Sequence, residues 1–216
     1  MLSSGGAAIT NGQTFFVGDG TNAATYNLRG GVHNFADNLT IRTNAFLTGC
    51  GTVNGNVTVD PGGTVAADCD GGGADFFLVL SPSGTLTFTG IVTNNGHIQA
   101  LNGTVVEAHG PVVNNGVINV LDGGTNFHST FINNGLVITS NSIPIITSIR
   151  KVGSNVQIRF TADNALPYVV QYATDLASGD WTPLTNMTGN GSILTAIDPG
   201  AATLSNRFYR AGLVVP

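Results

Sequence analysis

Residues 94–125 read NNGHIQALNGTVVEAHGPVVNNGVINVLDGGT, which is one short unit and the start of its repetition. The opening Asn-Asn-Gly turn recurs at nearly constant intervals, at 94–96, 114–116 and 133–135. Between the turns lie short runs in which apolar residues alternate with others, such as Ile118 and Val120. Each run is typical of a strand with one buried face, because a strand places alternate side chains on opposite sides. Strands between turns at a period of about 20 residues indicate a β-solenoid, in which each repeat forms one coil.

A second marker, a Gly-Thr pair, keeps a similar period over a longer part of the chain. Its four copies are Gly63-Thr64, Gly84-Thr85, Gly103-Thr104 and Gly124-Thr125. We interpret these pairs as one turn position in successive coils. Stacked coils pair their strands about 4.8 Å apart, so ladders of Asn and Thr are expected along the turns. The sequence thus predicts a parallel β-helix, a β-solenoid of about 20 residues per coil and about seven coils, over residues 1–142.

The repeat pattern ends near residues 140–142, and the remainder of the chain differs in composition and in the spacing of its strand-like runs. Residues 143–216 hold the only lysine, four of the six arginines and the only tryptophan, Trp181. Six short strand-like runs alternate there with turn signals such as Asn190-Gly191. Such a series predicts a small antiparallel β-sandwich of immunoglobulin or fibronectin III character. We therefore expect an all-β chain with two domains, residues 1–142 and 143–216.

Composition narrows the choice of partners. Charged residues make up only 9% of the 216 residues, where about a quarter is usual. Hydrophobic residues make up 42%, enough to bury a core, which excludes intrinsic disorder. The net charge is −5 with no basic face, and no apolar run approaches the length of a membrane span, so we expect neither nucleic acid nor a membrane span. The first residues do not form a signal peptide, and we expect the chain to be a piece or mature form of a longer protein.

Two parts of the chain resemble modules of bacterial surface proteins. Residues 47–65, LTGCGTVNGNVTVDPGGTV, resemble the autotransporter-associated β-strand repeats of large secreted bacterial proteins. The carboxy-terminal residues 168–176, 181, 198–199 and 207–210 are similar to the closing module often found on such proteins. The resemblance implies a parallel β-helix stalk, an extracellular location at the bacterial cell surface, and a structural or adhesive role without catalytic residues. One departure is that Cys50 and Cys69 stand where the repeats usually have Ser or Gly.

The two cysteines are separated by one period of the repeat, which corresponds to one coil. A parallel stack therefore places Cys50 and Cys69 in neighbouring rungs. A rung spacing of about 4.8 Å falls within the Cα separations that a disulfide accepts, about 4.4–6.8 Å. We predict a disulfide between them, with two stacked free thiols as the alternative.

One candidate calcium site is a glycine-rich loop. Residues 68–75 carry three acids, Asp68, Asp70 and Asp75, whose oxygens are ligands that Ca²⁺ prefers. Their spacing matches no standard calcium loop, so we interpret this stretch as a solvated turn that protrudes from the stack.

All four histidines lie in the expected solenoid, at residues 33, 97, 109 and 128. His109 and His128 are one period apart and are expected to stack, and with Glu107 they offer an alternative metal site. Because ladder histidines on a polar face are the simpler interpretation, we predict no metal and no cofactor.

The sequence offers no constellation for catalysis. Only Arg29 and Arg42 are basic among residues 1–142, and the acids there are scattered singly, whereas β-helix enzymes acting on polysaccharides need clustered acids or a calcium site beside a base. In the second domain, Trp181 and the tyrosines at 168, 172 and 209 are interpreted as core residues, with a sugar-binding platform as the alternative.

We therefore expect a non-enzymatic extracellular structural protein, a rigid stalk or a self-assembling filament subunit at the bacterial surface. No cap precedes the first expected coil near Thr14, which favours end-to-end self-association. An adhesin or glycan-binding module that contacts surface glycans is the alternative, and a carbohydrate-active β-helix enzyme ranks third.

Overall fold

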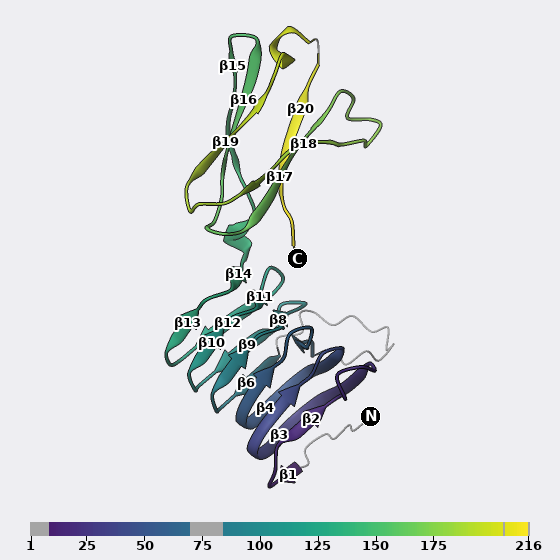
Figure 1. The fold of residues 1–216 in the computed structure, drawn as a ribbon, viewed down its shortest axis with the longest axis vertical. Coiled ribbons are helices and arrows are strands. Elements are labelled where there is room, and N and C mark those ends of the chain that lie inside the picture. Colours follow the sequence, from purple (N-terminus) through teal and green to yellow (C-terminus); the bar gives the residue numbers. More distant parts are fainter. Residues whose placement is uncertain (1–8, 70–83, 205, 216) are drawn as a thin grey trace. The chain divides into compact units, whose positions relative to one another are not determined.

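The computed structural model describes residues 9–69, 84–204 and 206–215. Nearly all regular structure in these residues is β-strand, as predicted, and the chain divides into two compact units, Met1–Thr139 and Ser140–Pro216 (Figure 1). The first unit is a parallel β-solenoid of about six turns, and the second contains antiparallel sheets. Among the described residues, no helix is long and apolar enough to cross a membrane.

Each coil of the solenoid contributes strands to three faces. The first face holds β5 (Thr64–Ala67), β8 (His97–Ala100), β11 (Val117–Asn119) and β14 (Leu136–Ile138). The second face holds β6 (Thr85–Phe88), β9 (Val105–Ala108) and β12 (Gly124–Phe127). The third face holds β7 (Val92–Asn94), β10 (Val112–Asn114) and β13 (Phe131–Asn133). In the earlier coils, β3 (Ala24–Ile41) and β4 (Ala45–Val59) each bend through all three faces, and they follow β1 (Ile9–Asn11) and β2 (Phe15–Val17).

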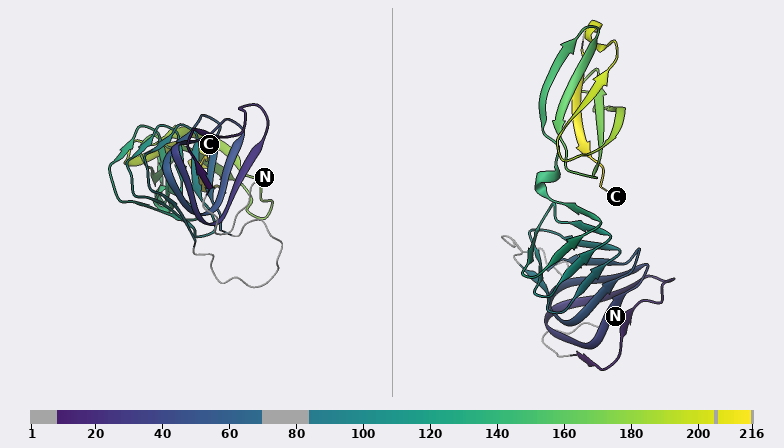
Figure 2. Two further views of the ribbon diagram at one scale, coloured as in Figure 1. Left: turned by 90° about the horizontal axis from the view of Figure 1, so that it is seen from below. Right: turned by 60° about the vertical axis from the view of Figure 1, so that its left-hand side comes forward.

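Parallel pairing in register stacks like residues in columns that run from coil to coil. On the first face, Leu47 pairs with Val65, Val65 with Ile98, and Ile98 with Ile118. These four side chains are at most 2% exposed. Burial of each such side chain stabilises the fold by about 1.5–3 kcal/mol. A single coil cannot bury this column, so the stack is the folding unit, and the right-hand view of Figure 2 shows the stacked coils from the side.

The four Gly-Thr pairs do not occupy one position in the stack. Thr64 pairs with His97 on the first face, so Gly63 lies in the row of the Asn-Asn-Gly glycines. Thr85 pairs instead with Val105 on the second face, and Val105 pairs with Gly124. Relative to Gly84, the glycine of the next copy, Gly103, therefore lies one position earlier in the row, and Gly124 lies one position later. The four pairs all lie at or near strand starts, but they do not form a single ladder, because the coils differ in length.

One coil is longer than the others, which explains why the structure has about six turns rather than seven. Thr64 pairs with His97 in the next coil, and His97 pairs with Val117 in the coil after that. The stretch of chain from Thr64 to His97 is nevertheless much longer than the stretch from His97 to Val117. The additional residues lie between β5 and β6, where residues 70–83 are outside the described part of the chain.

The second unit consists of two three-stranded antiparallel sheets. One sheet has the order β15 (Ile146–Val152), β16 (Asn155–Thr161) and β19 (Ile193–Asp198). The other has the order β18 (Thr182–Thr188), β17 (Pro167–Ala173) and β20 (Phe208–Leu213). Phe160 of the first sheet packs edge-on against Tyr168 of the second at 5.9 Å between ring centroids, and both are at most 1% exposed. Tyr168 is thus a core residue, as the sequence predicts.

Trp181 is only partly buried, so the expectation that it forms the core of this unit is not met. Its ring instead lies under the guanidinium of Arg210, 4.4 Å from the ring centroid. The core is built from aliphatic and aromatic residues of β16 and β17, including Ile158 and Val170, which are fully buried.

Near the start of the second unit, Ser142 contacts two later residues of the unit. Its hydroxyl donates to Asp163 at 2.7 Å, and its carbonyl accepts from the hydroxyl of Tyr168 at 3.1 Å.

Candidate functional site

A column of polar residues follows the carboxyl ends of the second-face strands. Asn54 donates from Nδ2 to Oδ1 of Asn34 at 2.8 Å, and the hydroxyl of Thr89 donates to Oδ1 of Asn54 at 3.0 Å. The strand register places His109 and then His128 next in this column, because Phe88 pairs with Ala108 and Ala108 with Phe127. The column therefore changes from amide and hydroxyl groups to imidazoles in the later coils.

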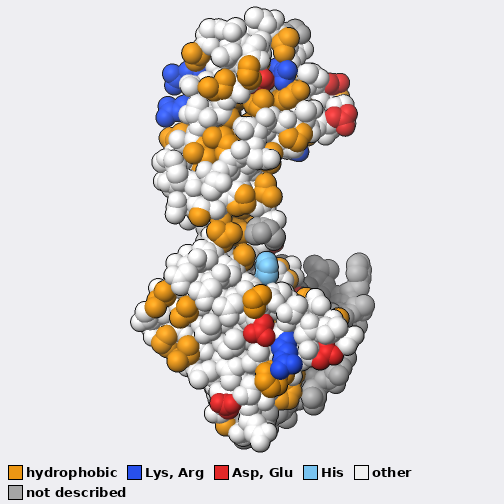
Figure 3. Space-filling view, viewed as in Figure 1, with side chains coloured by type: hydrophobic (Ala, Val, Ile, Leu, Met, Phe, Trp, Pro, Cys, Tyr) orange, Lys and Arg blue, Asp and Glu red, His pale blue; other side chains and the backbone are white. Residues whose placement is uncertain are grey.

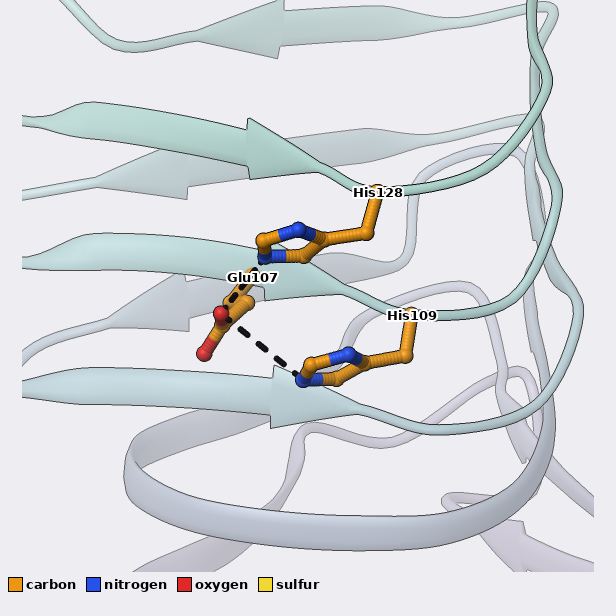
Figure 4. Close-up of side chains that lie close together, drawn as sticks. All are labelled: Glu107, His109 and His128. Atoms are coloured by element: carbon orange, nitrogen blue, oxygen red, sulfur yellow. Dashed lines mark hydrogen bonds and ion pairs between the residues drawn. The ribbon is translucent and has the colours of Figure 1, made fainter.

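His109 and His128 stack, as their separation by one period predicts. Their ring centroids are 4.7 Å apart and their planes differ by 8°. The backbone holds both residues in place, since His109 donates its N–H to the carbonyl of Phe88 and His128 donates its N–H to that of Ala108, each at 2.9 Å. Figure 4 shows the two rings one above the other, just beyond the ends of successive strands.

Glu107 lies on β9, two positions before His109, so both side chains leave the same side of the chain. Its Oε1 is 2.7 Å from Nε2 of His128 and 3.7 Å from Nε2 of His109. The second oxygen, Oε2, accepts from the hydroxyl of Thr87 in the preceding coil at 3.4 Å. The hydrogen bond with His128 lowers the pKa of the Glu107 carboxyl from its ordinary value, and the charges of both histidines add to this effect.

These three residues bring two imidazole nitrogens and one carboxylate oxygen within 4.8 Å of one another. The histidine side chains are 51% and 48% exposed and that of Glu107 is 25% exposed, so the group lies at the surface and is open to solvent. In the part of the chain that the structure describes, this is the one cluster of three metal-ligating side chains. Two nitrogens and a carboxylate oxygen are a donor set that Zn²⁺ and related ions accept.

The other two histidines lie elsewhere. His33 is buried, with Nδ1 2.8 Å from the hydroxyl of Tyr26 and Nε2 3.2 Å from the carbonyl of Gly30, so it is a core residue rather than a surface ladder residue. His97 is partly exposed and pairs with Thr64 and Val117 on the first face. Among the solenoid histidines, only the pair at 109 and 128 shares a carboxylate partner within the described residues.

The predicted disulfide is confirmed. Cys50, within β4, is bonded to Cys69, with the Cα atoms 5.1 Å apart. The bond joins two successive coils, just beyond the pairing of Gly49 with Ala67. Gly84, one of the repeat glycines, lies directly against it: a Cβ at this position would collide with Sγ of Cys69.

A ladder of asparagines runs inside the solenoid, at the inward-facing row of the third face. Asn94 and Asn114 are fully buried, and each donates from Nδ2 to Oδ1 of the next residue in the ladder, Asn114 and Asn133, at 2.7 Å. The second asparagines of the same turns form an exposed ladder, in which Asn115 and Asn134 donate to the preceding residue of their row. The repeated Asn-Asn-Gly turn predicts ladders, but it does not indicate that one of them is buried.

Most of the candidate calcium loop falls outside the described residues. Asp70 and Asp75 lie there, and only Asp68 is described. The Oδ1 atom of Asp68 accepts from Nδ2 of Asn102 at 3.5 Å, a contact with a neighbouring coil.

A charged and aromatic cluster occupies the second unit. The guanidinium of Arg207 lies 3.7 Å from the ring centroid of Tyr172 and 3.1 Å from the buried carboxylate of Asp198. The hydroxyl of Tyr209 donates to the same carboxylate at 3.0 Å. Burial and this hydrogen bond to Asp198 raise the pKa of Tyr209 to about 12. The aromatic faces of Tyr172 and Trp181 are thus covered by arginines of the same unit, which leaves less ring surface for a sugar.

Comparison with known proteins finds no family model, no curated protein and no solved structure that matches this chain. The β-solenoid arrangement is compatible with a β-repeat surface protein. The fold alone therefore defines the class of this protein, which is an all-β chain with a parallel β-solenoid followed along the sequence by an antiparallel unit.

Proposed function

We propose that this chain is a non-enzymatic structural element, a rigid β-solenoid stalk of an extracytoplasmic bacterial surface protein. The proposal rests on one observation, that polar side chains of successive coils form hydrogen bonds with one another. Asparagines in successive coils bond to one another in three ladders: 34 with 54, 94 with 114 and 133, and 95 with 115 and 134. Side chains engaged in this way stiffen the stack.

The surface of the solenoid supports the same role. Charged side chains are sparse on the face shown in Figure 3, where most of the solenoid surface is neutral polar side chain and backbone. The parallel strands of the three faces keep their pairing from coil to coil, so successive coils are held together on every face by the described strands. Such a stack resists bending and local opening better than a chain of separate domains joined by linkers.

The disulfide supports a location outside the cytoplasm. Disulfides persist in oxidising compartments, and Cys50–Cys69 joins two coils of the solenoid. The resemblance of residues 47–65 to the repeats of secreted bacterial proteins points to the cell surface. The similarity of residues 168–176, 181, 198–199 and 207–210 to the closing module of such proteins supports a second proposal, that the second unit is a fibronectin III-like closing module.

The proposal is tested by challenging the purified chain with protease and, separately, with an array of glycans. A structural stalk is expected to leave the solenoid as one resistant fragment and to show no saturable binding on the array. Rapid cleavage throughout residues 84–139, at the rate found for denatured chain, would contradict a rigid stalk. Saturable binding to one class of glycan would instead favour the adhesin alternative.

A second candidate function, end-to-end assembly of copies, is favoured by the last coil of the solenoid. Strands β12, β13 and β14 are each paired on one side only among the described strands. Phe131 and Ile132 on β13 are 38% and 49% exposed. Unpaired strand edges with exposed apolar residues accept further strands. Light scattering over a range of concentrations tests this, and a mass that stays monomeric throughout would exclude it.

A further inference from the structure

The cluster of Glu107, His109 and His128 has a geometry that an ordinary surface ladder does not need. In the earlier coils of the same column, Asn34, Asn54 and Thr89 bond directly to the residue above or below. The two histidines do not bond to each other. Both present Nε2 to one oxygen, Oε1 of Glu107, at 3.7 and 2.7 Å.

We propose that Glu107, His109 and His128 bind a divalent transition-metal ion of the Zn²⁺ type, through Nε2 of each histidine and a carboxylate oxygen. The site requires no partner and stands whether or not the chain serves as a stalk. It differs from the candidate calcium loop in both place and chemistry, because imidazole nitrogens select Zn²⁺, Cu²⁺ or Ni²⁺ rather than Ca²⁺.

The distances suit this assignment. In a tetrahedral zinc site the ion lies about 2.0–2.1 Å from each ligand atom, which places ligand atoms about 3.4 Å apart. The three ligand atoms here are already within 4.8 Å of one another, and the pairs with Oε1 lie at 2.7 and 3.7 Å, on either side of that value. All three side chains are partly exposed, so the small rotations that close the site meet little resistance.

The backbone supplies the organisation that a metal site needs. The N–H groups of His109 and His128 are each bonded to the preceding coil at 2.9 Å, which sets the separation of the two imidazoles. Oε2 of Glu107 accepts from the hydroxyl of Thr87 at 3.4 Å, which leaves Oε1 facing the histidines. Outer-shell bonds of this kind orient metal ligands and raise affinity. Three protein ligands leave a fourth position open for water.

A metal ion at this place would join two coils. Glu107 and His109 belong to the coil of β8, β9 and β10, and His128 belongs to that of β11, β12 and β13. The bound ion therefore links these coils, as the disulfide links two earlier ones. Because an ion bound only by the folded chain stabilises it, Zn²⁺ is expected to raise the unfolding temperature of the solenoid.

The test is a calorimetric titration of Zn²⁺ into the complete chain, purified without a polyhistidine tag. The variants His109→Asn and His128→Asn introduce the residue that the column already carries at 34 and 54, so the fold is expected to tolerate them. We expect the wild type to bind one equivalent and each variant to bind about 10-fold more weakly or not at all. The matched control, His97→Asn, removes a solenoid histidine outside the cluster and is expected to leave the affinity unchanged.

Substitution with Co²⁺ provides a second readout that is independent of heat and stability. Visible absorption bands of tetrahedral Co²⁺ are expected with the wild type and absent with Glu107→Gln. The proposal is overturned if the wild type binds no Zn²⁺, if the His109→Asn, His128→Asn double variant binds as tightly as the wild type, or if His97→Asn weakens binding to the same extent. Circular dichroism of each variant confirms that its solenoid is folded.

Discussion

Asn94 donates a hydrogen bond from Nδ2 to Oδ1 of Asn114 over 2.7 Å, and both side chains are fully buried inside the solenoid. The same amide group of Asn94 also donates to the carbonyl of Val117 at 3.1 Å, while its Oδ1 accepts from the N–H of Gly96 at 3.2 Å. A buried amide is stabilising only when its groups are paired, and here the pairing is provided by successive coils. These bonds form only when successive coils are in register, so the buried ladder stabilises the solenoid in that register.

Substitution Asn114→Ala is expected to lower the free energy of unfolding of the solenoid by about 3 kcal/mol. The change removes the acceptor of Asn94 and the donor to Asn133, and it leaves a cavity beside the buried amide of Asn94. Urea denaturation followed by circular dichroism measures the effect. The control, Asn115→Ala, breaks the exposed ladder in the adjacent position and is expected to cost about 0.5 kcal/mol or less. Equal effects of the two variants would contradict a special role for the buried ladder.

Removal of the disulfide by Cys50→Ala with Cys69→Ala is expected to destabilise the solenoid by about 3 kcal/mol. The bond closes a loop that spans one coil, and its loss increases the freedom of the unfolded chain. Guanidinium denaturation of both proteins gives the difference. Fluorescence of Trp181, the only tryptophan, serves as an internal control, because it reports the second unit and its transition is expected to stay unchanged. An unchanged solenoid transition would show that stacking alone holds these coils.

Substitution Gly84→Ala is expected to cost about 2 kcal/mol and to slow formation of the disulfide. A Cβ at residue 84 would collide with Sγ of Cys69 and would stand 2.9 Å from Sγ of Cys50, so the bond or the strand has to move. Gly124→Ala is the matched control from the same set of Gly-Thr pairs. Its Cβ would meet only Cγ2 of Val105 at 3.7 Å, an ordinary contact, and we expect a change within about 0.5 kcal/mol. Mass spectrometry after alkylation, during refolding, gives the rate of disulfide formation. Equal rates and equal stabilities in the two variants would refute the close packing of Gly84.

The second unit is expected to lose stability as pH rises from about 10 to about 12. Tyr209 has its pKa raised from 10.0 to about 12 in the folded state, by burial and by its hydrogen bond to Asp198. The folded unit therefore holds a proton that the unfolded chain releases, so the stabilisation is complete below pH 10 and disappears as pH passes through the folded value. Trp181 fluorescence in denaturant at about pH 9 and about pH 11 measures the change.

The variant Tyr209→Phe tests whether the hydroxyl of Tyr209 causes this fall in stability. It removes the titrating hydroxyl, so the fall in stability between the two pH values is expected to be smaller than in the wild type. Tyr168, whose pKa burial also raises, is expected to supply the residual slope. A variant with the same slope as the wild type would show that Tyr209 does not carry the effect.

The period of the repeats was sufficient to predict the coiled architecture and the Cys50–Cys69 bond. Both follow from local spacing, because residues one period apart in a parallel stack lie in adjacent rungs. The same reasoning predicts that His109 and His128 stack. It fails for Gly63, which lies in a different row from Gly84, because coils of unequal length shift the later Gly-Thr pairs to another face.

The repeats alone do not predict which side chain of each turn points into the solenoid. Asn94 and Asn95 are adjacent, chemically identical and repeated together, yet one is buried and the other partly exposed. The path of the backbone through the turn selects the inward residue, and only the neighbouring coils determine that path. Trp181 shows the same limit in the second unit, where Arg210 covers a ring that hydrophobicity assigns to the core.

The sequence alone determines that this chain stacks coils of about 20 residues, because every coil repeats a pattern of apolar residues that only a neighbour can bury. It also places Glu107 and His109 on one side of a strand, since alternate side chains share a face. Their convergence with His128 on a single carboxylate oxygen was decided by the tertiary structure. That convergence depends on the register between two coils, which is set by the whole length of their pairing and not by the residues of the site.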